Sequence, residues 1–167
     1  QKCSAASRVY IPLSIWKETW NLAEGQLKRM KMGPPEDFTN FINAVIDEAS
    51  FDKLKEFIDR AKDDADASVI YGGGCDKSKG YFIEPTVIAD VSPTARIAQE
   101  EIFGPVLALI KAEGWRHGLE IANNTEFGLT GAVYSNNRRN LEQARQDFFV
   151  GNLYINRNQI GAVVGVQ

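Results

Sequence analysis

The sequence has few of the residues that bind metals or crosslink secreted domains. It contains two cysteines and one histidine in 167 residues. Cys3 and Cys75 stand in no CxxC or Cys/His spacing and His117 is isolated, so we expect no metal site. Sparse cysteine is more typical of a reducing compartment than of a disulfide-stapled secreted domain. A disulfide between Cys3 and Cys75 remains an alternative.

Long apolar runs and basic clusters are also missing. No stretch approaches the roughly 18 apolar residues that a membrane-spanning helix needs. Nineteen Lys and Arg are outnumbered by 22 Asp and Glu, which gives a net charge of −3. We therefore expect no nucleic-acid partner, no membrane span and no signal peptide. The 44% hydrophobic and 25% charged fractions fit one globular domain.

Short β-branched segments alternate with amphipathic ones along the chain, without an obvious linker or repeat. The pattern predicts strands at 8–12, 68–71, 81–91 with a break at Pro85, 106–110, 130–135 and 152–156. It predicts helices from an N-cap at Ser14 to Gly33, from Ser50 onward, over 115–124 and over 138–148. This alternation indicates an α/β fold with a mostly parallel sheet that is covered by helices.

The first seven residues, QKCSAAS, place a thiol beside a lysine and small side chains. One interpretation is that Cys3 is an ordinary small hydrophobic residue. The other is that it is a nucleophile, because Lys2 would favour the thiolate and the small neighbours leave room for a substrate. No histidine is nearby to act as a base, so papain-like chemistry is poorly supported.

Two further stretches are candidates for ligand binding. The triplet Gly72–Gly74 lacks the GxGxxG spacing and no helix follows it, so a turn after a strand is the better interpretation than a phosphate cradle. The stretch EEIFGPV (100–106) is either a loop with surface acids or a site that presents a carboxylate and an aromatic ring at a strand end, where α/β folds place ligands. Such a carboxylate could accept hydrogen bonds from ribose hydroxyls.

Four stretches taken together resemble one family. QKCSAAS, GYFIEPTVIADV leading into QEEIFGPV, NNTEFGLTGAVYS and VGNLYIN are similar to the aldehyde dehydrogenase superfamily, in that family's order and spacing. The resemblance covers nearly the whole chain. Within the superfamily, the Lys-Cys-Ser start and the ending NLYINRNQIGAVVGVQ are similar to the members that oxidise L-glutamate γ-semialdehyde, the open form of 1-pyrroline-5-carboxylate, to glutamate in proline catabolism.

The resemblance implies roles for three residues in catalysis and cofactor binding. Cys3 matches the catalytic thiol, which attacks the aldehyde and passes through a thiohemiacetal and a thioester. Glu101 matches the glutamate that binds the nicotinamide ribose of NAD, and Phe103 matches the aromatic residue beside it. NAD is the implied cofactor.

The resemblance also implies a substrate anchor. Gly161 and Ala162 match the loop whose backbone N–H groups bind the α-carboxylate, with Ser4 beside the nucleophile and an electrostatic contribution from Lys2. Some relatives have Thr-Gly-Ser where this chain has Ile-Gly-Ala. Backbone donors would survive that difference, whereas a side-chain hydroxyl contact would not.

The remaining implications concern the whole protein. Residues 1–167 are expected to be an incomplete catalytic domain, with the dinucleotide-binding domain outside the chain, so the chain alone is expected to be inactive. The parent is expected to be a homo-oligomer in the cytoplasm, or in the mitochondrial matrix of a eukaryote. Two alternatives stay open: another NAD(P)-dependent semialdehyde or aldehyde dehydrogenase, and a catalytically silent scaffold of the same type.

Overall fold

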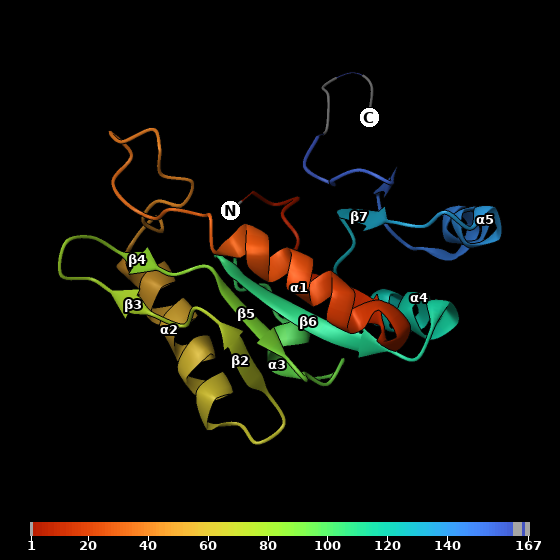
Figure 1. The fold of residues 1–167 in the computed structure, drawn as a ribbon, viewed down its shortest axis with the longest axis horizontal. Helices are drawn as coiled ribbons and strands as arrows, with labels where there is room; N and C mark the ends of the chain where they lie inside the picture. The colour runs from red at the N-terminus through yellow and green to blue at the C-terminus, as the bar shows by residue number, and fades with distance from the viewer. Residues whose placement is uncertain (1, 162–164, 166–167) are drawn as a thin grey trace.

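The structure is a computed structural model that describes residues 2–161 and Gly165. Strands and helices alternate along most of the chain (Figure 1). In order, the elements are β1 (Arg8–Pro12), the 3-10 helix η1 (Leu13–Ile15), α1 (Trp16–Leu27), α2 (Glu48–Asp63), β2 (Ser68–Tyr71), β3 (Cys75–Asp76), β4 (Phe82–Ile83), β5 (Thr86–Ala89), α3 (Arg96–Gln99), β6 (Val106–Ala112), α4 (Trp115–Asn123), β7 (Thr130–Val133), α5 (Arg138–Asp147) and β8 (Asn152–Ile155). Among the described residues, no helix is long and apolar enough to cross a membrane.

The central sheet has four strands in the order β1-β6-β5-β2. Strand β6 pairs in parallel with both β1 and β5, whereas β2 joins β5 in antiparallel orientation at the edge. Strands β7 and β8 form a separate parallel pair, and β3 and β4 form a short antiparallel one. The predicted α/β fold with a mostly parallel sheet is therefore confirmed, with an antiparallel edge that the sequence pattern did not indicate.

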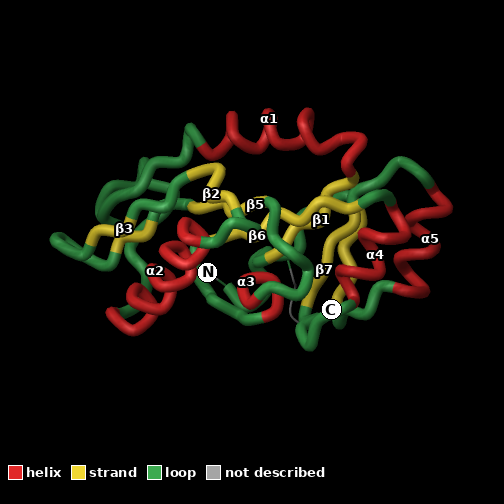
Figure 2. The backbone as a smooth tube through the Cα atoms, turned by 90° about the horizontal axis from the view of Figure 1, so that it is seen from below, coloured by secondary structure: helices red, strands yellow, loops and turns green. Residues whose placement is uncertain are grey.

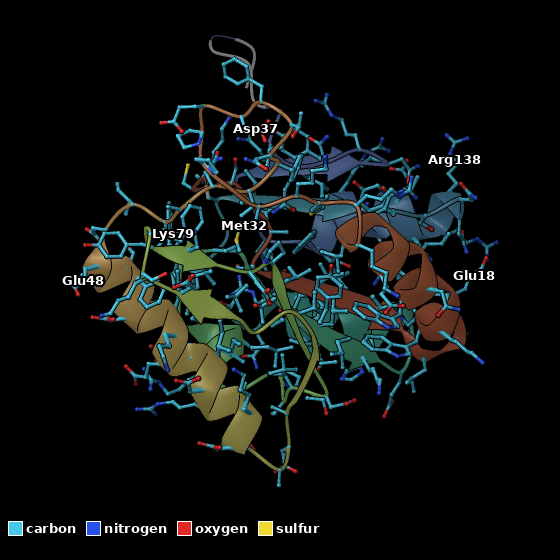
Figure 3. The ribbon with its side chains drawn as sticks, turned by 60° about the vertical axis from the view of Figure 1, so that its left-hand side comes forward. Glu18, Met32, Asp37, Glu48, Lys79 and Arg138 are labelled. Carbon is cyan, nitrogen blue, oxygen red and sulfur yellow. The ribbon has the colours of Figure 1, made fainter. Side chains whose placement is uncertain are left out.

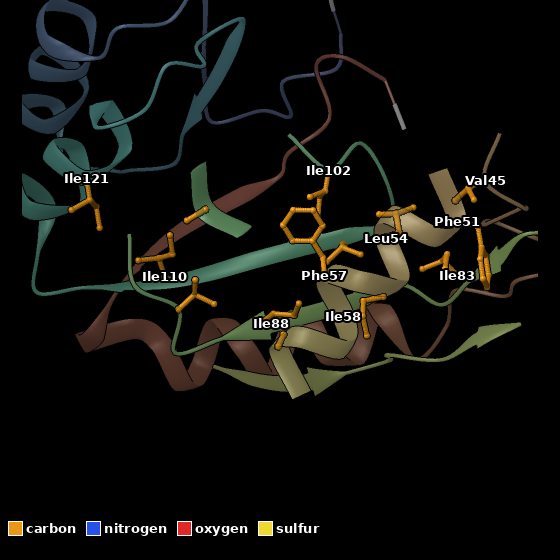
Figure 4. Close-up of a cluster of buried hydrophobic side chains, with 14 of the residues drawn as sticks. Val45, Phe51, Leu54, Phe57, Ile58, Ile83, Ile88, Ile102, Ile110 and Ile121 are labelled. Carbon is orange, nitrogen blue, oxygen red and sulfur yellow. The ribbon is translucent and has the colours of Figure 1, made fainter. Parts of the chain in front are cut away.

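Helices cover both faces of this sheet, α1 on one and α2 with α3 on the other (Figure 2). Because successive strand residues point to opposite faces, Val87 and Leu109 pack toward α1 while Ile88 and Ile110 pack toward α2. Figure 4 shows the larger cluster, in which Leu54 of α2 is fully buried. Burying a side chain of this size contributes about 1.5–3 kcal/mol.

The helix starts differ from the predictions. Ser14 lies inside η1 and caps nothing, because the 3-10 turn joins β1 directly to the helix and the N–H of Trp16 donates to the Leu13 carbonyl. Helix α2 begins before Ser50, which instead donates its N–H to the side chain of the true N-cap, Asp47, at 2.8 Å. An aspartate at this position satisfies an N–H that the helix itself leaves unpaired.

Helix α1 also ends earlier than predicted. It stops at Leu27, and a long loop over 28–47 follows instead of further helical turns. The carbonyl of Lys31 accepts from the N–H groups of Phe41 and Ile42, which ties the two sides of the loop together. The loop projects away from the sheet, with Asp37 toward its outer end (Figure 3).

Candidate active site

The thiol of Cys3 is presented on a closed turn. The N–H of Ala5 donates to the Lys2 carbonyl at 3.0 Å, which places Cys3 and Ser4 at the tip of a four-residue turn. Thr130 at the start of β7 donates its hydroxyl to the Ser4 carbonyl at 3.4 Å. The Cys3 side chain is exposed and Ser4 is half-buried. The backbone around the thiol is thus held from two sides while the sulfur itself is open to a substrate.

The second cysteine has a different environment. Cys75 is half-buried in β3, and burial raises the pKa of its thiol. A raised pKa leaves less thiolate at neutral pH, and the thiolate is the nucleophilic form. Cys3 is therefore the better placed of the two for covalent chemistry.

The loop between α3 and β6 presents a carboxylate and an aromatic ring. Ile102 is buried in the core, which turns its neighbours Glu101 and Phe103 outward, where both are exposed. Phe103 has a φ of 58°, in the left-handed region that non-glycine residues rarely adopt. Lys53 of α2 donates to the Glu101 carbonyl at 2.6 Å, and a Cβ on Gly104 would lie 2.3 Å from a methyl of Leu54. The loop is therefore fixed to α2 on both sides of the exposed pair.

The Cys3 turn and the Glu101–Phe103 loop lie at the same end of two neighbouring strands of the sheet. The turn precedes β1 and the loop precedes β6, and these strands are parallel neighbours with Arg8 opposite Ala108. Both segments therefore reach the amino ends of the strands. This corrects the physical argument from the sequence, because α/β sheets place ligands at the carboxyl ends. A joint site is supported instead by the pairing of β1 with β6, which brings both segments to the same ends of adjacent strands.

The proposed carboxylate anchor follows β8. Gly161 is half-buried, and a Cβ there would lie 2.3 Å from Nη2 of Arg157, whose guanidinium also stacks over the Tyr154 ring at 5.3 Å. Ala162 lies outside the described residues. Lys2 is exposed, and its carbonyl, rather than its side chain, takes part in the turn. Figure 1 shows the segment after β8 on the same side of the molecule as the N-terminal turn.

The hydrogen bonds of the described residues join only part of the predicted set. They connect the Cys3–Ser4 turn to β7, but none links it directly to Glu101, Phe103 or Gly161. The supporting residues Arg8 and Thr130 were missed by the motif analysis. An arginine inside the otherwise apolar strand RVYIP was the one signal for Arg8, because a charge in a half-buried strand needs a partner.

Comparison with known proteins assigns the family. A sequence profile described as the aldehyde dehydrogenase family matches residues 1–166. The chain belongs to the aldehyde dehydrogenase family. This confirms the resemblance carried by the four motifs.

Individual relatives agree with this membership. The chain is 52% identical to the 1-pyrroline-5-carboxylate dehydrogenase of Geobacillus sp. (strain WCH70), over 100% of this chain and 32% of the relative. It superimposes with a TM-score of 0.94 on the 1-pyrroline-5-carboxylate dehydrogenase from Thermus with bound NAD, at 42% identity, covering 100% of this chain and 32% of that one. Proline utilization A from Bdellovibrio bacteriovorus matches with a TM-score of 0.93 and 35% identity, over 99% of this chain and 17% of that one.

These matches also show how much of its relatives' length the chain covers. It spans about a third of the length of the curated relatives that it matches. The family fold of the catalytic region is confirmed by the structural superposition. Activity and substrate are properties of the whole protein, whereas this chain matches about a third of such a relative.

Proposed function

We propose that the protein carrying this chain oxidises L-glutamate γ-semialdehyde to glutamate with NAD. The observation that carries the proposal is the 52% identity, along the entire chain, to a relative named for this activity. The exposed thiol on a closed turn supplies the nucleophile that such a reaction needs. Residues 1–167 would then belong to the catalytic domain, with the dinucleotide-binding domain encoded elsewhere in the protein.

Cys3 performs the covalent chemistry in this proposal. Its thiolate forms a bond to the aldehyde carbon, and the carbonyl oxygen becomes an oxyanion that the Cys3 N–H can bind. Oxidation of this carbon gives a thioester. Water then cleaves the thioester, which releases the carboxylic acid and restores the thiol. The exposure of Cys3 gives both the aldehyde and the water access to the sulfur.

The Glu101–Phe103 loop fits the nicotinamide half of NAD. When bound, NAD supplies the acceptor for the hydride that leaves the oxidised carbon. The Glu101 carboxylate is exposed and can accept hydrogen bonds from ribose hydroxyls, while the half-exposed Phe103 ring offers an apolar surface to a planar heterocycle. The buried Ile102 between them keeps both side chains on the outer face of the loop.

Selectivity for the semialdehyde would come from an anion site at a fixed distance from Cys3. We assign it to the N–H groups of Gly161 and Ala162, the hydroxyl of Ser4 and the charge of Lys2. The Arg157 guanidinium beside Gly161 adds a positive charge on this loop. Donors left unpaired in a closed site are costly, so aldehydes without an α-carboxylate should be rejected by orders of magnitude. A homo-oligomer and a cytoplasmic location stay predictions from the resemblance.

The test is the ratio of kcat/KM for the semialdehyde to that for propanal in the whole protein. We expect a preference well above tenfold, and Gly161→Val should raise the KM for the semialdehyde while leaving NAD binding unchanged. Gly25→Val is the matched control, because a Cβ at Gly25 in α1 would contact nothing within 4 Å. A preference below about tenfold, or ~1.4 kcal/mol of discrimination, would favour a general aldehyde dehydrogenase. Absence of any Cys3-dependent oxidation would favour the silent scaffold.

A further inference from the structure

Arg8 connects the nucleophile segment to two other segments of the site. It lies at the start of β1, five residues after Cys3, and its Nη1 donates to the Ala98 carbonyl at 3.0 Å and to the Thr125 hydroxyl at 3.4 Å. Its guanidinium also lies 5.6 Å from the centre of the Phe127 ring. Among the described residues, no Asp or Glu lies within ion-pair distance of it.

Gln99 makes a parallel connection. Its side-chain amide donates to the Pro93 carbonyl at 2.7 Å and to the Asn124 carbonyl at 2.8 Å. Gln99 is the last residue of α3 and stands two positions before Glu101, so its contacts bear directly on the Glu101–Phe103 loop. Arg8 and Gln99 thus join α3 to the same 124–127 loop from two directions.

Together these contacts form a closed circuit. The Cys3 turn leads along the chain to Arg8 at the start of β1, and Arg8 binds α3 at Ala98. From α3, Gln99 binds the 124–127 loop, and that loop leads into β7. The first residue of β7, Thr130, donates back to the Ser4 carbonyl in the Cys3 turn. A displacement of α3 relative to the turn would break several hydrogen bonds of this circuit at once.

We propose that Arg8 is a positioning residue that, with Gln99, holds the Cys3 turn at a fixed offset from the Glu101–Phe103 loop. This inference rests on the proposed function, since the offset matters only when a thiol-bound substrate must meet a cofactor. A guanidinium suits the task because its Nη1 reaches both acceptors while the planar group lies over the Phe127 ring, and the compact, strongly hydrated ammonium of a lysine cannot make that planar contact. A misplacement of about 1 Å in such a site can cost about a hundredfold in rate.

The experiment separates two activities of the same thiol in the whole protein. Oxidation of the semialdehyde needs both Cys3 and the cofactor loop, whereas hydrolysis of 4-nitrophenyl acetate passes through a Cys3 thioester without hydride transfer and so does not need the cofactor loop. Rates are expressed per Cys3 thiol titrated with iodoacetamide, which removes differences in the folded fraction. The variants are Arg8→Met, Arg8→Lys and Gln99→Met. Arg29→Met is the matched control, because Arg29 is exposed and its side chain donates to the Gly25 carbonyl, four residues earlier.

We expect Arg8→Met to lower the kcat of oxidation by at least ~10-fold while the KM for the semialdehyde changes by less than ~3-fold. Ester hydrolysis should stay within ~2-fold of the unsubstituted protein. Gln99→Met should show the same split with a smaller loss, Arg8→Lys should recover only part of it, and Arg29→Met should change neither activity. If Arg8→Met does not fold, Arg8→Lys and Gln99→Met show the same split.

Two results would overturn the inference. An unchanged oxidation rate in both Arg8→Lys and Gln99→Met would show that the circuit does not position the site. Equal losses of oxidation and ester hydrolysis would show that these residues support the thiol itself and not its offset from the loop. If the protein oxidises a different aldehyde instead of the semialdehyde, the proposed substrate is wrong, yet the same split with that aldehyde still tests Arg8.

Discussion

The conformation of Phe103 permits a prediction whose sign is set by the backbone. At a φ of 58° the Cβ of a residue crowds the following carbonyl oxygen, which only glycine avoids. The position is held by buried Ile102 on one side and by Gly104, packed against Leu54, on the other. Replacing Phe103 by alanine removes the ring and keeps this strain. Replacing it by glycine removes both.

The cost of a left-handed alanine can be compared with the entropic cost of a glycine. A left-handed conformation costs an alanine roughly 1–2 kcal/mol. Glycine is disfavoured by roughly 0.5–1 kcal/mol because its unfolded chain has more freedom to lose. Phe103→Gly should therefore be more stable than Phe103→Ala by about 0.75 kcal/mol, within a range that reaches about 1.5 kcal/mol. At Phe149, which is 74% exposed and has no positive φ, the same pair of substitutions should give the opposite sign.

Denaturant unfolding of the four variants measures both differences, provided that the slope m is the same within each pair. If glycine is less stable than alanine at both positions, Phe103 is not held in the left-handed conformation and the reasoning fails. NAD affinity gives a second measurement. Both Phe103 variants should lose affinity equally, since both lack the ring, and retention of full affinity in either would remove Phe103 from the cofactor site.

Three further outcomes are expected. Cys3→Ala should abolish oxidation, and Cys75→Ser should leave it nearly unchanged. Burial raises the pKa of the Cys75 thiol. Its alkylation by iodoacetamide should therefore begin at higher pH than that of an ordinary thiol. Glu101→Gln should slow oxidation or weaken NAD binding by about 1–3 kcal/mol, as for a hydrogen bond to a charged group. Unchanged kinetics would show that Glu101 is a surface acid with no role in cofactor binding. Lys111 donates to Asp90 at 2.6 Å and lowers the pKa of that carboxyl, so the stability from this pair is present above about pH 4 and is lost as the pH falls through the lowered pKa. The pair is nearly half exposed, which limits the effect to about 1 kcal/mol, and Lys111→Met should remove it from a pH series of unfolding midpoints.

The sequence predicted the strands of this fold better than its helix ends. Runs such as VLALI in β6 are β-branched and apolar because both faces of the sheet are covered, and that pattern is local. Helix starts depend on which side chain reaches a free N–H. Ser14 was predicted as a cap and Ser50 as a helix start, yet the 3-10 turn after Pro12 precedes α1 and the carboxylate of Asp47 caps α2. The two-residue strands β3 and β4 are too short to show any alternation.

The candidate site shows a similar division. Motif resemblance points to Cys3 and Glu101 as candidates, but it contains no information about strand order. The position of the two loops at one edge follows from β1 pairing with β6, which are distant in the sequence. The supporting contacts of Arg8 and Gln99 end on backbone carbonyls, and any residue can supply a carbonyl. Such partners leave no trace in residue types, so only a three-dimensional structure reveals them.

The hydrogen-bonding groups near this edge also determine which part of a dinucleotide it can bind. Phosphate sites in α/β folds need free backbone N–H groups, typically from a glycine-rich turn or a helix N-terminus. In the turn after β2 these groups are already used, since Gly73 donates to the Thr86 hydroxyl and Gly74 to the Glu84 carboxylate, each at 3.0 Å. The N-terminus of α2 carries Asp47 and Glu48, whose charges repel a phosphate. These two segments therefore give a pyrophosphate no cradle, and the proposed contact between Glu101 and a ribose predicts that Glu101→Gln weakens the binding of nicotinamide mononucleotide and of NAD by the same factor.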